Sequence, residues 1–252
     1  MSINPIIKTD YPDPDVIRVD DAYFMISTTM YFFPGGVILR SFDLVNWEIY
    51  SYIFDKLDDT PSERLEGNEN NYGKGMWAAT LREHNGKFYV AFVSHGKDDT
   101  HLFVADKLEG PWEHKTIKGY YHDCSIIWLD DKKQVFIVHG NTEIRLTELK
   151  EDLSGPKEGG IDKVIIKDNK DDVTLGYEGS HIYKINNRFY ITLIHWPKYN
   201  KRRTESVFVS DNIDGPYEGK DVFYDDLGLK DMGAAQGGLV DTPDGRWYSI
   251  VF

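Results

Sequence analysis

Three acidic residues stand at matched positions in the sequence and could do chemistry together. Five segments of the chain share one pattern, which is a predicted strand, a polar turn and a second strand that opens with an aromatic residue. Their leading residues are Asp13, Trp77, Asp123, Glu178 and Gln236. A buried carboxylate without a partner is strongly unfavourable, so an acid that returns at one position in three segments favours a functional role. Taken singly, each acid could equally be a turn or surface residue.

Paired carboxylates are typical of proteins that hydrolyse a glycosidic bond. A protonated carboxyl group gives its proton to the departing oxygen, while an ionised one activates a water molecule on the opposite face of the sugar ring. Inversion of the anomeric centre needs about 6.5–9.5 Å between the two groups, so that the water fits. A third carboxylate near the acid would raise the pKa of that acid through like-charge repulsion. Three acids at one site would therefore suit inverting hydrolysis.

The segments that carry these acids have the pattern of antiparallel β-strands. Short runs of Val, Ile, Tyr, Phe and Thr alternate with polar turns, of which Asn85-Gly86 and Asp244-Gly245 supply the positive φ angles that two-residue hairpins need. Most segments continue into a third and a fourth strand, and four strands in each repeat of roughly 40–50 residues are typical of a β-propeller. We therefore predict an all-β fold, a five-bladed β-propeller with four-stranded antiparallel blades around a central funnel. A two-sheet sandwich, the competing fold, does not explain five repeats that begin alike.

A propeller would bring the leading residues of all blades to one axial mouth, because the innermost strand of every blade starts at the same face. Asp123 in blade three would lie next to Glu178 in blade four. Asp13 in blade one would stand well apart from Glu178, as inversion requires. The whole functional interpretation depends on this shared cavity.

The fifth blade is expected to be incomplete. We treat residues 1–252 as a single propeller domain, and the sequence reaches Phe252 after only two strands of that blade. Either residues 3–7 pair with these strands or the sequence is part of a longer chain. An open apolar edge at Val251 and Phe252 would favour aggregation, which argues for the longer chain.

Composition excludes several other classes of protein. The 252 residues include 42 acidic and 29 basic side chains, a formal net charge of −13, which argues against a nucleic-acid partner because phosphate binding needs a basic patch. The short basic cluster at residues 201–203 is expected to be a solvated loop.

The longest apolar run, residues 88–93, is too short to span a bilayer, so no membrane partner is expected. No basic and apolar leader precedes Tyr11, which predicts a cytoplasmic location. The single cysteine, Cys124, excludes an internal disulfide and a multi-cysteine metal site, and we expect it in the core.

Several motifs occur in a specific order along the whole chain. They are Asn4-Pro5-Ile6-Ile7, Tyr11-Pro12-Asp13-Pro14-Asp15, Gly75-Met76-Trp77-Ala78, Asp123-Cys124-Ser125, residues 177–184 (YEGSHIYK) and residues 237–245 (GGLVDTPDG). With these motifs the sequence resembles glycoside hydrolase family 43, the five-bladed propeller β-xylosidases, α-L-arabinofuranosidases and arabinanases. The resemblance implies that Asp13 is the general base, Glu178 the general acid and Asp123 the residue that tunes and orients the acid. Between Asp13 and Asp15, only the family pattern selects Asp13 as the base.

The expected sugar contacts are mostly aromatic. Trp77 stands at the mouth by its register, and the loop that contains Phe32 and Phe33 resembles a subsite wall of the family. Packing within a blade is the alternative for the tryptophans in this set, and it is the expected role of Trp47, Trp112 and Tyr217 at the outer edges of their blades. The predicted substrate-binding residues are Trp77, Phe32, Phe33, His181, Trp196 and Gln236.

The resemblance also bears on metal binding. Many members of the family carry a histidine near an axial ion at the position where this chain has Gln236. We therefore expect no required cofactor and no metal ligand. A calcium or sodium ion held at the axis through water is the alternative.

The function that the resemblance implies is that of an inverting, exo-acting glycoside hydrolase. It would release terminal β-D-xylosyl or α-L-arabinofuranosyl units from short hemicellulose-derived oligosaccharides. An endo-acting arabinanase or xylanase of the same fold is one alternative, since the sequence does not show whether the pocket is closed on one side. A non-catalytic propeller that binds carbohydrate is another, although a binding module has no need to keep three acids in register.

Overall fold

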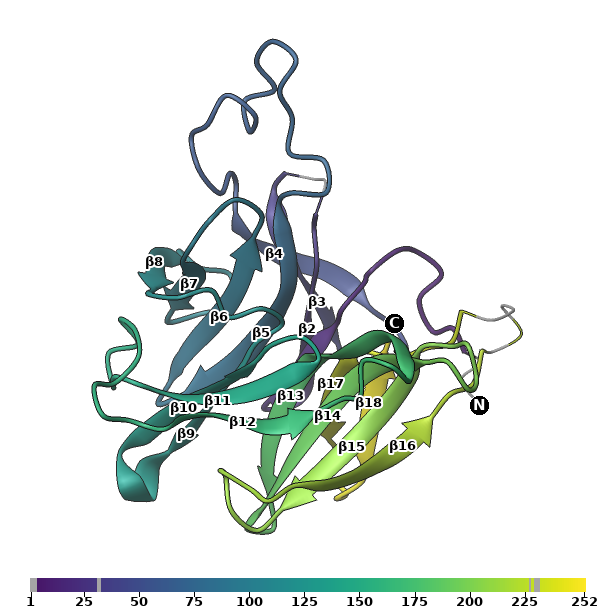
Figure 1. Ribbon diagram of the computed structural model, residues 1–252. Helices are drawn as coiled ribbons and strands as arrows, with labels where there is room; N and C mark the ends of the chain where they lie inside the picture. Colours follow the sequence, from purple (N-terminus) through teal and green to yellow (C-terminus); the bar gives the residue numbers. More distant parts are fainter. Residues whose placement is uncertain (1–3, 31–32, 227, 229–231) are drawn as a thin grey trace.

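The computed structural model describes residues 4–30, 33–226, 228 and 232–252, and this part of the chain forms antiparallel β-sheets around an axis (Figure 1). The first sheet contains β1 (Asp15–Val19), β2 (Ala22–Ser27), β3 (Gly35–Ser41) and β4 (Glu48–Phe54). The second contains β5 (Met76–His84), β6 (Lys87–Ser94), β7 (Thr100–Ala105) and β8 (Glu113–Ile117). The third contains β9 (Ser125–Leu129), β10 (Gln134–His139), β11 (Glu143–Leu149) and β12 (Asp162–Lys167), with a 3₁₀ turn, η1 (Asp130–Lys132), between β9 and β10. The fourth contains β13 (Val173–Ile185), β14 (Arg188–Pro197), β15 (Thr204–Ser210) and β16 (Glu218–Phe223), and the fifth contains β17 (Gly237–Asp241) and β18 (Trp247–Val251).

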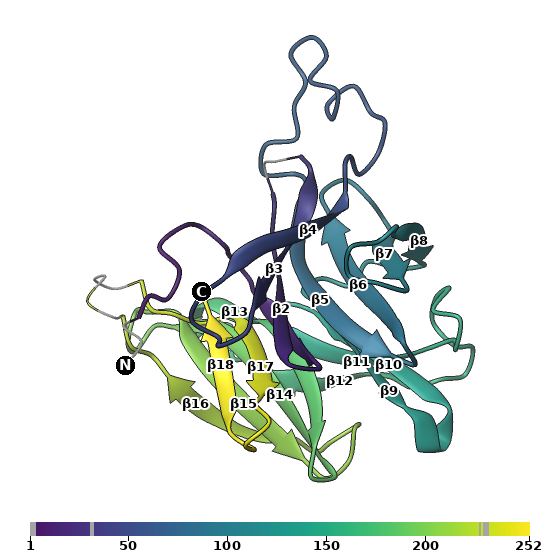
Figure 2. The same cartoon turned by 180° about the vertical axis from the view of Figure 1, so that it is seen from behind.

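The sheets close into a ring through their first strands. β1 contacts β5, β5 contacts β9, β9 contacts β13, and β17 contacts both β13 and β1. Figure 2 shows the fifth sheet, drawn in yellow, beside the first and the fourth sheets. The predicted all-β propeller is therefore confirmed, with four complete four-stranded blades and a fifth blade of two strands in the described residues.

The N-terminal segment does not pair into the fifth blade within its described part. Residues 4–7 form no strand. Ile7 instead packs with Ile250 against the apolar cluster between the first and fifth sheets. Residue 3 of the predicted segment lies outside the described residues.

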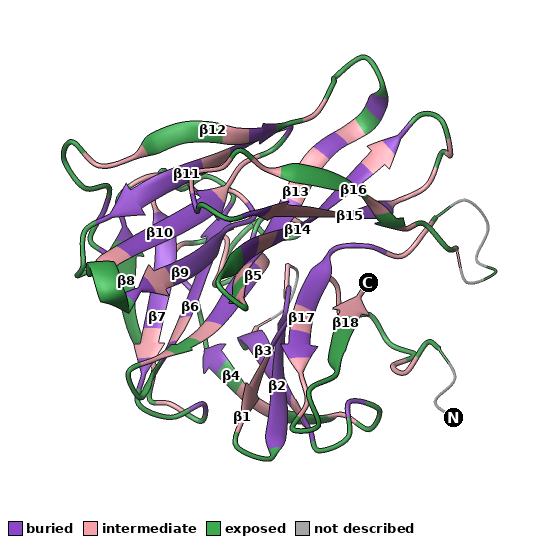
Figure 3. Ribbon diagram, turned by 90° about the horizontal axis from the view of Figure 1, so that it is seen from below, coloured by how far each residue is buried: buried purple, intermediate pink, exposed green. Residues whose placement is uncertain are grey.

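The middle strands of the four-stranded blades are largely buried because apolar side chains pack between neighbouring sheets. All six residues of β2 are buried, whereas β8, β12 and β16 at the outside are largely exposed (Figure 3). Buried apolar clusters fill the spaces between the first and second, second and third, third and fourth, and first and fifth sheets. These clusters hold the blades around the axis and so set the positions of the first strands.

The residues predicted to serve packing alone do so. Trp47, Trp112 and Tyr217 pack against three of these clusters, and Cys124 is a buried free thiol in the cluster between the second and third sheets. Within the part of the chain that the structure describes, no helix is long and apolar enough to cross a lipid bilayer.

Candidate active site

The backbone turns sharply at the leading residues of the blades. Asp13 (φ 53°) and Asp123 (φ 48°) adopt the left-handed conformation one residue away from the starts of β1 and β9, and Gln236 (φ 65°) does so directly before β17. Aspartate tolerates this conformation better than most residues because its short side chain can hydrogen-bond locally. Strained backbone of this kind gathers at functional sites, and here it occurs at two of the three acids, Asp13 and Asp123.

Glu178 reaches the same end of the propeller through a bulged strand. The pairing of β13 with β14 shifts register on both sides of Glu178, and such bulges re-aim a side chain. Gly179 follows with φ 64°, and a Cβ atom there would lie only 2.7 Å from Gln236 Cγ. Glycine is therefore needed behind Glu178 for both its backbone angle and its space.

Glu178 and Asp123 lie on two sides of one histidine. Glu178 Oε2 is 3.3 Å from His122 Nε2 and also accepts a hydrogen bond from Asn141 Nδ2. Asp123 Oδ1 is 3.7 Å from the same His122 nitrogen. Ligating atoms of His122, Asp123 and Glu178 lie within 4.8 Å of one another. The structure thus brings the predicted acid and its predicted modulator together.

Asp123 is fixed by the residues that surround Glu178. Its Oδ2 accepts hydrogen bonds from the Gly179 N–H (3.1 Å) and from the Gln236 side-chain amide (3.4 Å). Burial raises the pKa of Asp123 to about 7, and the charges of Glu178 and Asp13 act in the same direction, against the opposing effect of His122. Asp123 therefore responds electrostatically to both of the other acids.

Asp13 stands outside the group formed by His122, Asp123 and Glu178. Thr28 Oγ1 donates a hydrogen bond to its Oδ2 at 2.8 Å. Burial raises the pKa of Asp13, and the charge of Glu178 adds to this effect, while the Thr28 hydrogen bond and Arg203 oppose it. A carboxylate with a raised pKa accepts a proton more readily than an ordinary one, as a general base must.

Asp15 is committed to the scaffold instead. It is fully buried, and its Oδ2 accepts hydrogen bonds from the Leu81 N–H (2.7 Å) and the Arg82 guanidinium. Burial by itself would raise the pKa of Asp15, but Arg82, His181 and the Leu81 N–H outweigh it and lower the pKa to about 2. A carboxylate held in this way does not take up a proton near neutral pH. The structure therefore supplies a physical reason to prefer Asp13 over Asp15 as the base.

Polar contacts below the acids tie the first strands together. Asp15 on β1 bonds Arg82 on β5, whose other terminal nitrogen donates to Ser125 Oγ on β9 at 2.6 Å. Ser125 Oγ in turn accepts the Ile182 N–H of β13 at 3.2 Å. This chain of contacts crosses four blades and fixes the strands from which the three acids project.

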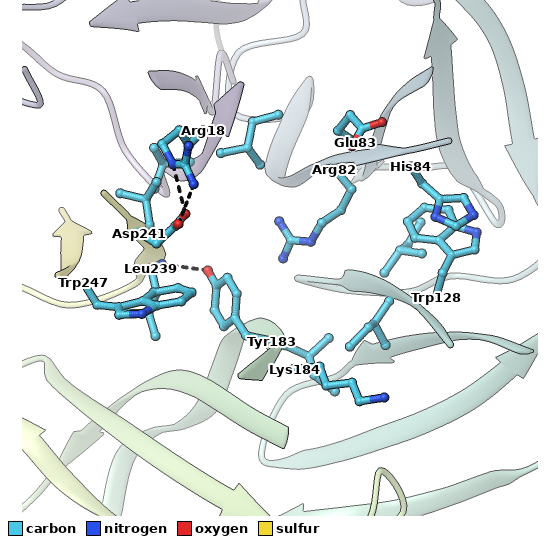
Figure 4. Close-up of a pocket in the computed structure, with 16 residues that line it drawn as sticks. Arg18, Arg82, Glu83, His84, Trp128, Tyr183, Lys184, Leu239, Asp241 and Trp247 are labelled. Carbon is cyan, nitrogen blue, oxygen red and sulfur yellow. Dashed lines mark hydrogen bonds and ion pairs between the residues drawn. The ribbon is translucent and has the colours of Figure 1, made fainter. Parts of the chain in front are cut away.

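The opposite end of the funnel opens into a separate pocket of about 360 Å³ (Figure 4). Its wall contains the Arg18–Asp241 ion pair (2.7 Å) and the hydrogen bond from the Leu239 N–H to the Tyr183 hydroxyl (2.7 Å), both drawn in Figure 4. Apart from Trp247 on β18, its lining consists of residues that follow the leading positions along the first strands, and the three acids are not among them. The candidate chemistry therefore belongs to the other end of the axis.

Two of the predicted aromatic contacts lie near the acids. Trp77 is half-buried on β5 and packs against the rings of His95 and His122, and its Nε1 has no hydrogen-bond partner among the described residues. Phe33 lines a pocket of about 300 Å³ together with Thr28, the residue that holds Asp13. Phe32 lies outside the described residues.

Of the other predicted sugar contacts, His181 and Gln236 are buried. His181 is 4 % exposed, with Nδ1 3.2 Å from Asp15 Oδ1. Gln236 is 8 % exposed, and its amide donates to Asp123. Trp196 is half-buried on β14. For these three residues, contact with a sugar stays a prediction.

The sequence interpretation missed three polar side chains at this end of the propeller. His122 and Asn141 contact Glu178, and Arg203 acts electrostatically on Asp13. Arg203 also lies over the Phe252 ring at 5.4 Å, so the expectation of a purely solvated loop is wrong for this residue. Their positions in the chain could have indicated them. His122 directly precedes the leading residue Asp123, and Asn141 and Arg203 lie in the connections after second strands, β10 and β14. In a propeller, both kinds of position lie at the same end of the blade as the leading residues.

His122, Asp123 and Glu178 also form a group that is close enough to offer three atoms to a metal ion. Asn141 donates a hydrogen bond to Glu178 Oε2, and Gly179 donates one to Asp123 Oδ2, whereas Asp123 Oδ1 is the oxygen closer to His122. We derive no step through a metal.

Fold and site together define a class of protein. A closed propeller ring carries three carboxylates at one axial mouth, two of them around a shared histidine and the third apart with a raised pKa. A glycoside hydrolase uses two separate carboxyl groups, one to deliver a proton to the glycosidic oxygen and one to activate water, and this site offers carboxyl groups for both tasks.

Comparisons with known proteins narrow this class. The sequence matches glycosyl hydrolases family 43 over residues 2–252. A β-xylosidase of Formosa agariphila is 30 % identical over 98 % of this chain and 45 % of its own, and a non-reducing end α-L-arabinofuranosidase of Bacteroides ovatus is 29 % identical over 98 % and 46 %. The solved structure of a bifunctional GH43-CE protein of Bacteroides eggerthii has a TM-score of 0.91 at 41 % identity and covers 100 % of this chain and 32 % of that one. The chain belongs to glycosyl hydrolases family 43, and it spans about half the length of the curated relatives it matches.

Because the pKa of Asp123 is raised in the folded chain, the free energy of unfolding is expected to depend on pH. Asp123→Asn is expected to stabilise the fold at pH 8 and to change it little near pH 4. The carboxyl ionises near its ordinary value of 3.8 in the unfolded chain and near 7 in the folded one, so stability falls as pH rises through this window. The loss is at most about 1.4 kcal/mol per pH unit, and an asparagine, which resembles the protonated carboxyl, avoids it. Thermal unfolding followed by circular dichroism from pH 4 to 8.5 measures the difference.

Asp15→Asn is the matched control, with the opposite sign. The pKa of Asp15 is lowered to about 2, so its stabilising effect is present above pH 3.8 and disappears as pH falls towards 2. This variant should be less stable than the wild type at pH 7. Tm curves of Asp123→Asn that run parallel to the wild type at every pH would contradict the raised pKa of Asp123.

Proposed function

We propose that the chain is the catalytic propeller of an inverting, exo-acting glycosidase that releases terminal β-D-xylosyl or α-L-arabinofuranosyl units from short oligosaccharides. The observation that supports this most is the arrangement of the acids, with Asp123 and Glu178 around His122 and Asp13 apart from them. The names of the relatives, a β-xylosidase and an α-L-arabinofuranosidase, support the choice of sugar. No cofactor enters the proposal.

Each acid has a separate task in this mechanism. Glu178 gives its proton to the departing oxygen as the glycosidic C–O bond breaks. Asp13, held by Thr28, takes a proton from the water whose oxygen forms the new bond to the anomeric carbon. Asp123 orients the acid through its hydrogen bond to the N–H of Gly179, the residue that follows Glu178.

A panel of aryl glycosides tests the proposal. The protein is expected to release the phenol from an aryl β-D-xyloside, an aryl α-L-arabinofuranoside or both, and proton NMR should show the inverted anomer of the sugar first. A retained anomer would contradict the water-activating role of Asp13. Activity on dye-linked arabinan or xylan but on neither aryl glycoside would favour endo action. A protein inert on all of them that still binds the oligosaccharides would be a non-catalytic propeller.

A further inference from the structure

His122 is held in place from several sides next to the proposed acid. Its Nε2 is 3.3 Å from Glu178 Oε2, and its side chain is 24 % exposed. The ring meets the Trp77 indole edge-on at 5.8 Å and stacks on Tyr120 at 6.4 Å. Its carbonyl oxygen accepts the Gly140 N–H at 2.9 Å. The imidazole is therefore fixed in direction and still reaches solvent.

The groups that face His122 are mostly acidic. Burial by itself would lower the pKa of His122, but the hydrogen bond to Glu178 and the charges of Asp123, Glu178 and Asp13 outweigh burial and raise it. The guanidinium of Arg203 acts on Asp13. Burial lowers the pKa of His139, on the next strand of the blade, to about 4, so His139 carries no positive charge near neutral pH. A proton on His122 is therefore electrostatically favoured at this site.

After each turnover of inverting hydrolysis, the general base carries a proton and the general acid lacks one. The bond cleavage takes one proton from Glu178 to the departing oxygen, and the attack of water delivers one proton to Asp13. Asp13 has to lose its proton to solvent, and Glu178 has to regain one, before the next substrate reacts. A donor that touches both Glu178 and solvent would restore the acid directly.

We propose that His122 is the positioning residue that aims Glu178 at the leaving oxygen and returns a proton to it between turnovers, an inference that rests on the function proposed above. In the return step the His122 Nε2–H bond breaks as its proton moves to Glu178 Oε2, and the partly exposed ring then takes a proton from water. The proton that Asp13 released to solvent balances this uptake. No bond to the sugar involves His122.

Two variants and two leaving groups test this role in the full-length protein. His122→Phe keeps a ring against Trp77 but has no donor, and His122→Gln keeps a donor without a titrating ring. On a phenyl glycoside, which needs the acid, we expect His122→Phe to lower kcat by about 10- to 100-fold, within the range of acid–base effects. On a 2,4-dinitrophenyl glycoside, whose leaving group departs without a proton, both variants should stay close to the wild type. His122→Gln should recover part of the loss on the phenyl substrate, because it still orients Glu178.

His84→Phe is the matched control. His84 stacks on Trp128 at 4.5 Å and lines the pocket at the opposite end of the axis, so this variant changes a stacked histidine away from the acids. Its kcat should equal that of the wild type on both substrates. Equal losses on the two substrates in His122→Phe and His122→Gln, or no loss on either, would overturn the role of His122 while leaving the proposed function intact. A wild-type protein inert on both would overturn the proposed function and the role of His122 with it.

Discussion

Asp13→Asn is expected to lower kcat by about 10²- to 10⁴-fold on every aryl glycoside, whatever its leaving group. Asparagine keeps the shape of the side chain and can still accept the hydrogen bond from Thr28 Oγ1. It cannot take the proton of the attacking water, and that proton has to leave in every turnover. A better leaving group therefore does not restore the rate. Steady-state kinetics on phenyl and 2,4-dinitrophenyl glycosides measure this.

Asp21→Asn is the control for this prediction. Asp21 is exposed in the turn between β1 and β2, at the other end of the blade, so its removal should leave kcat unchanged. Nearly full activity in Asp13→Asn would mean that another group activates the water. Asp15 would not be the next candidate, because Arg82 and the Leu81 N–H already hold its carboxylate.

Glu178→Gln is expected to separate the two leaving groups. On the phenyl glycoside kcat should fall by about 10²- to 10⁴-fold, because the departing phenoxide needs the proton that glutamine cannot give. On the 2,4-dinitrophenyl glycoside the loss should be far smaller, because this leaving group is stable as an anion. Glutamine can still occupy the place between His122 and Asn141, so the fold of the site should persist. The ratio of the two kcat values is the measured quantity.

Glu83→Gln controls for the loss of a glutamate from a first strand. Glu83 is exposed on β5 and lines the pocket at the opposite end of the axis, so neither substrate should react more slowly. An equal loss on both substrates in Glu178→Gln would assign this carboxylate to water activation or binding. The roles of Asp13 and Glu178 would then have to be exchanged or abandoned.

The repeated strands and the acids that precede them could be predicted from the sequence, because strands and turns are determined largely by residues that are close together in the chain. Alternation of apolar residues and turns such as Asn85-Gly86 reflect local backbone preferences. Antiparallel order then sends the first strand of every blade in the same direction, which places Asp13, Asp123 and Glu178 at one end. No contact between distant residues is needed for these steps.

The partners of the acids could not be predicted in the same way. His122 and Glu178 are 56 positions apart in the chain, and Asp15 and Arg82 are 67 apart. Such pairs arise only when neighbouring blades pack side by side, since each of the two blades supplies one member. The choice between Asp13 and Asp15 as base is an example, because Asp15 is held by Leu81 and Arg82 of the second blade and by His181 of the fourth, whereas Asp13 is held by Thr28.

The amino-acid sequence by itself determined which acids stand at the mouth, because repeated strands carry their first residues to a common face. The tertiary structure alone decided what each acid can do. Asp15 and Asp123 start from the same ordinary pKa of 3.8, yet the folded chain lowers the first to about 2 and raises the second to about 7. The physical reason is that the protonation of a carboxyl group depends on its burial and on nearby charges, and most of these charges come from other blades, such as Arg82 for Asp15 and Glu178 for Asp123.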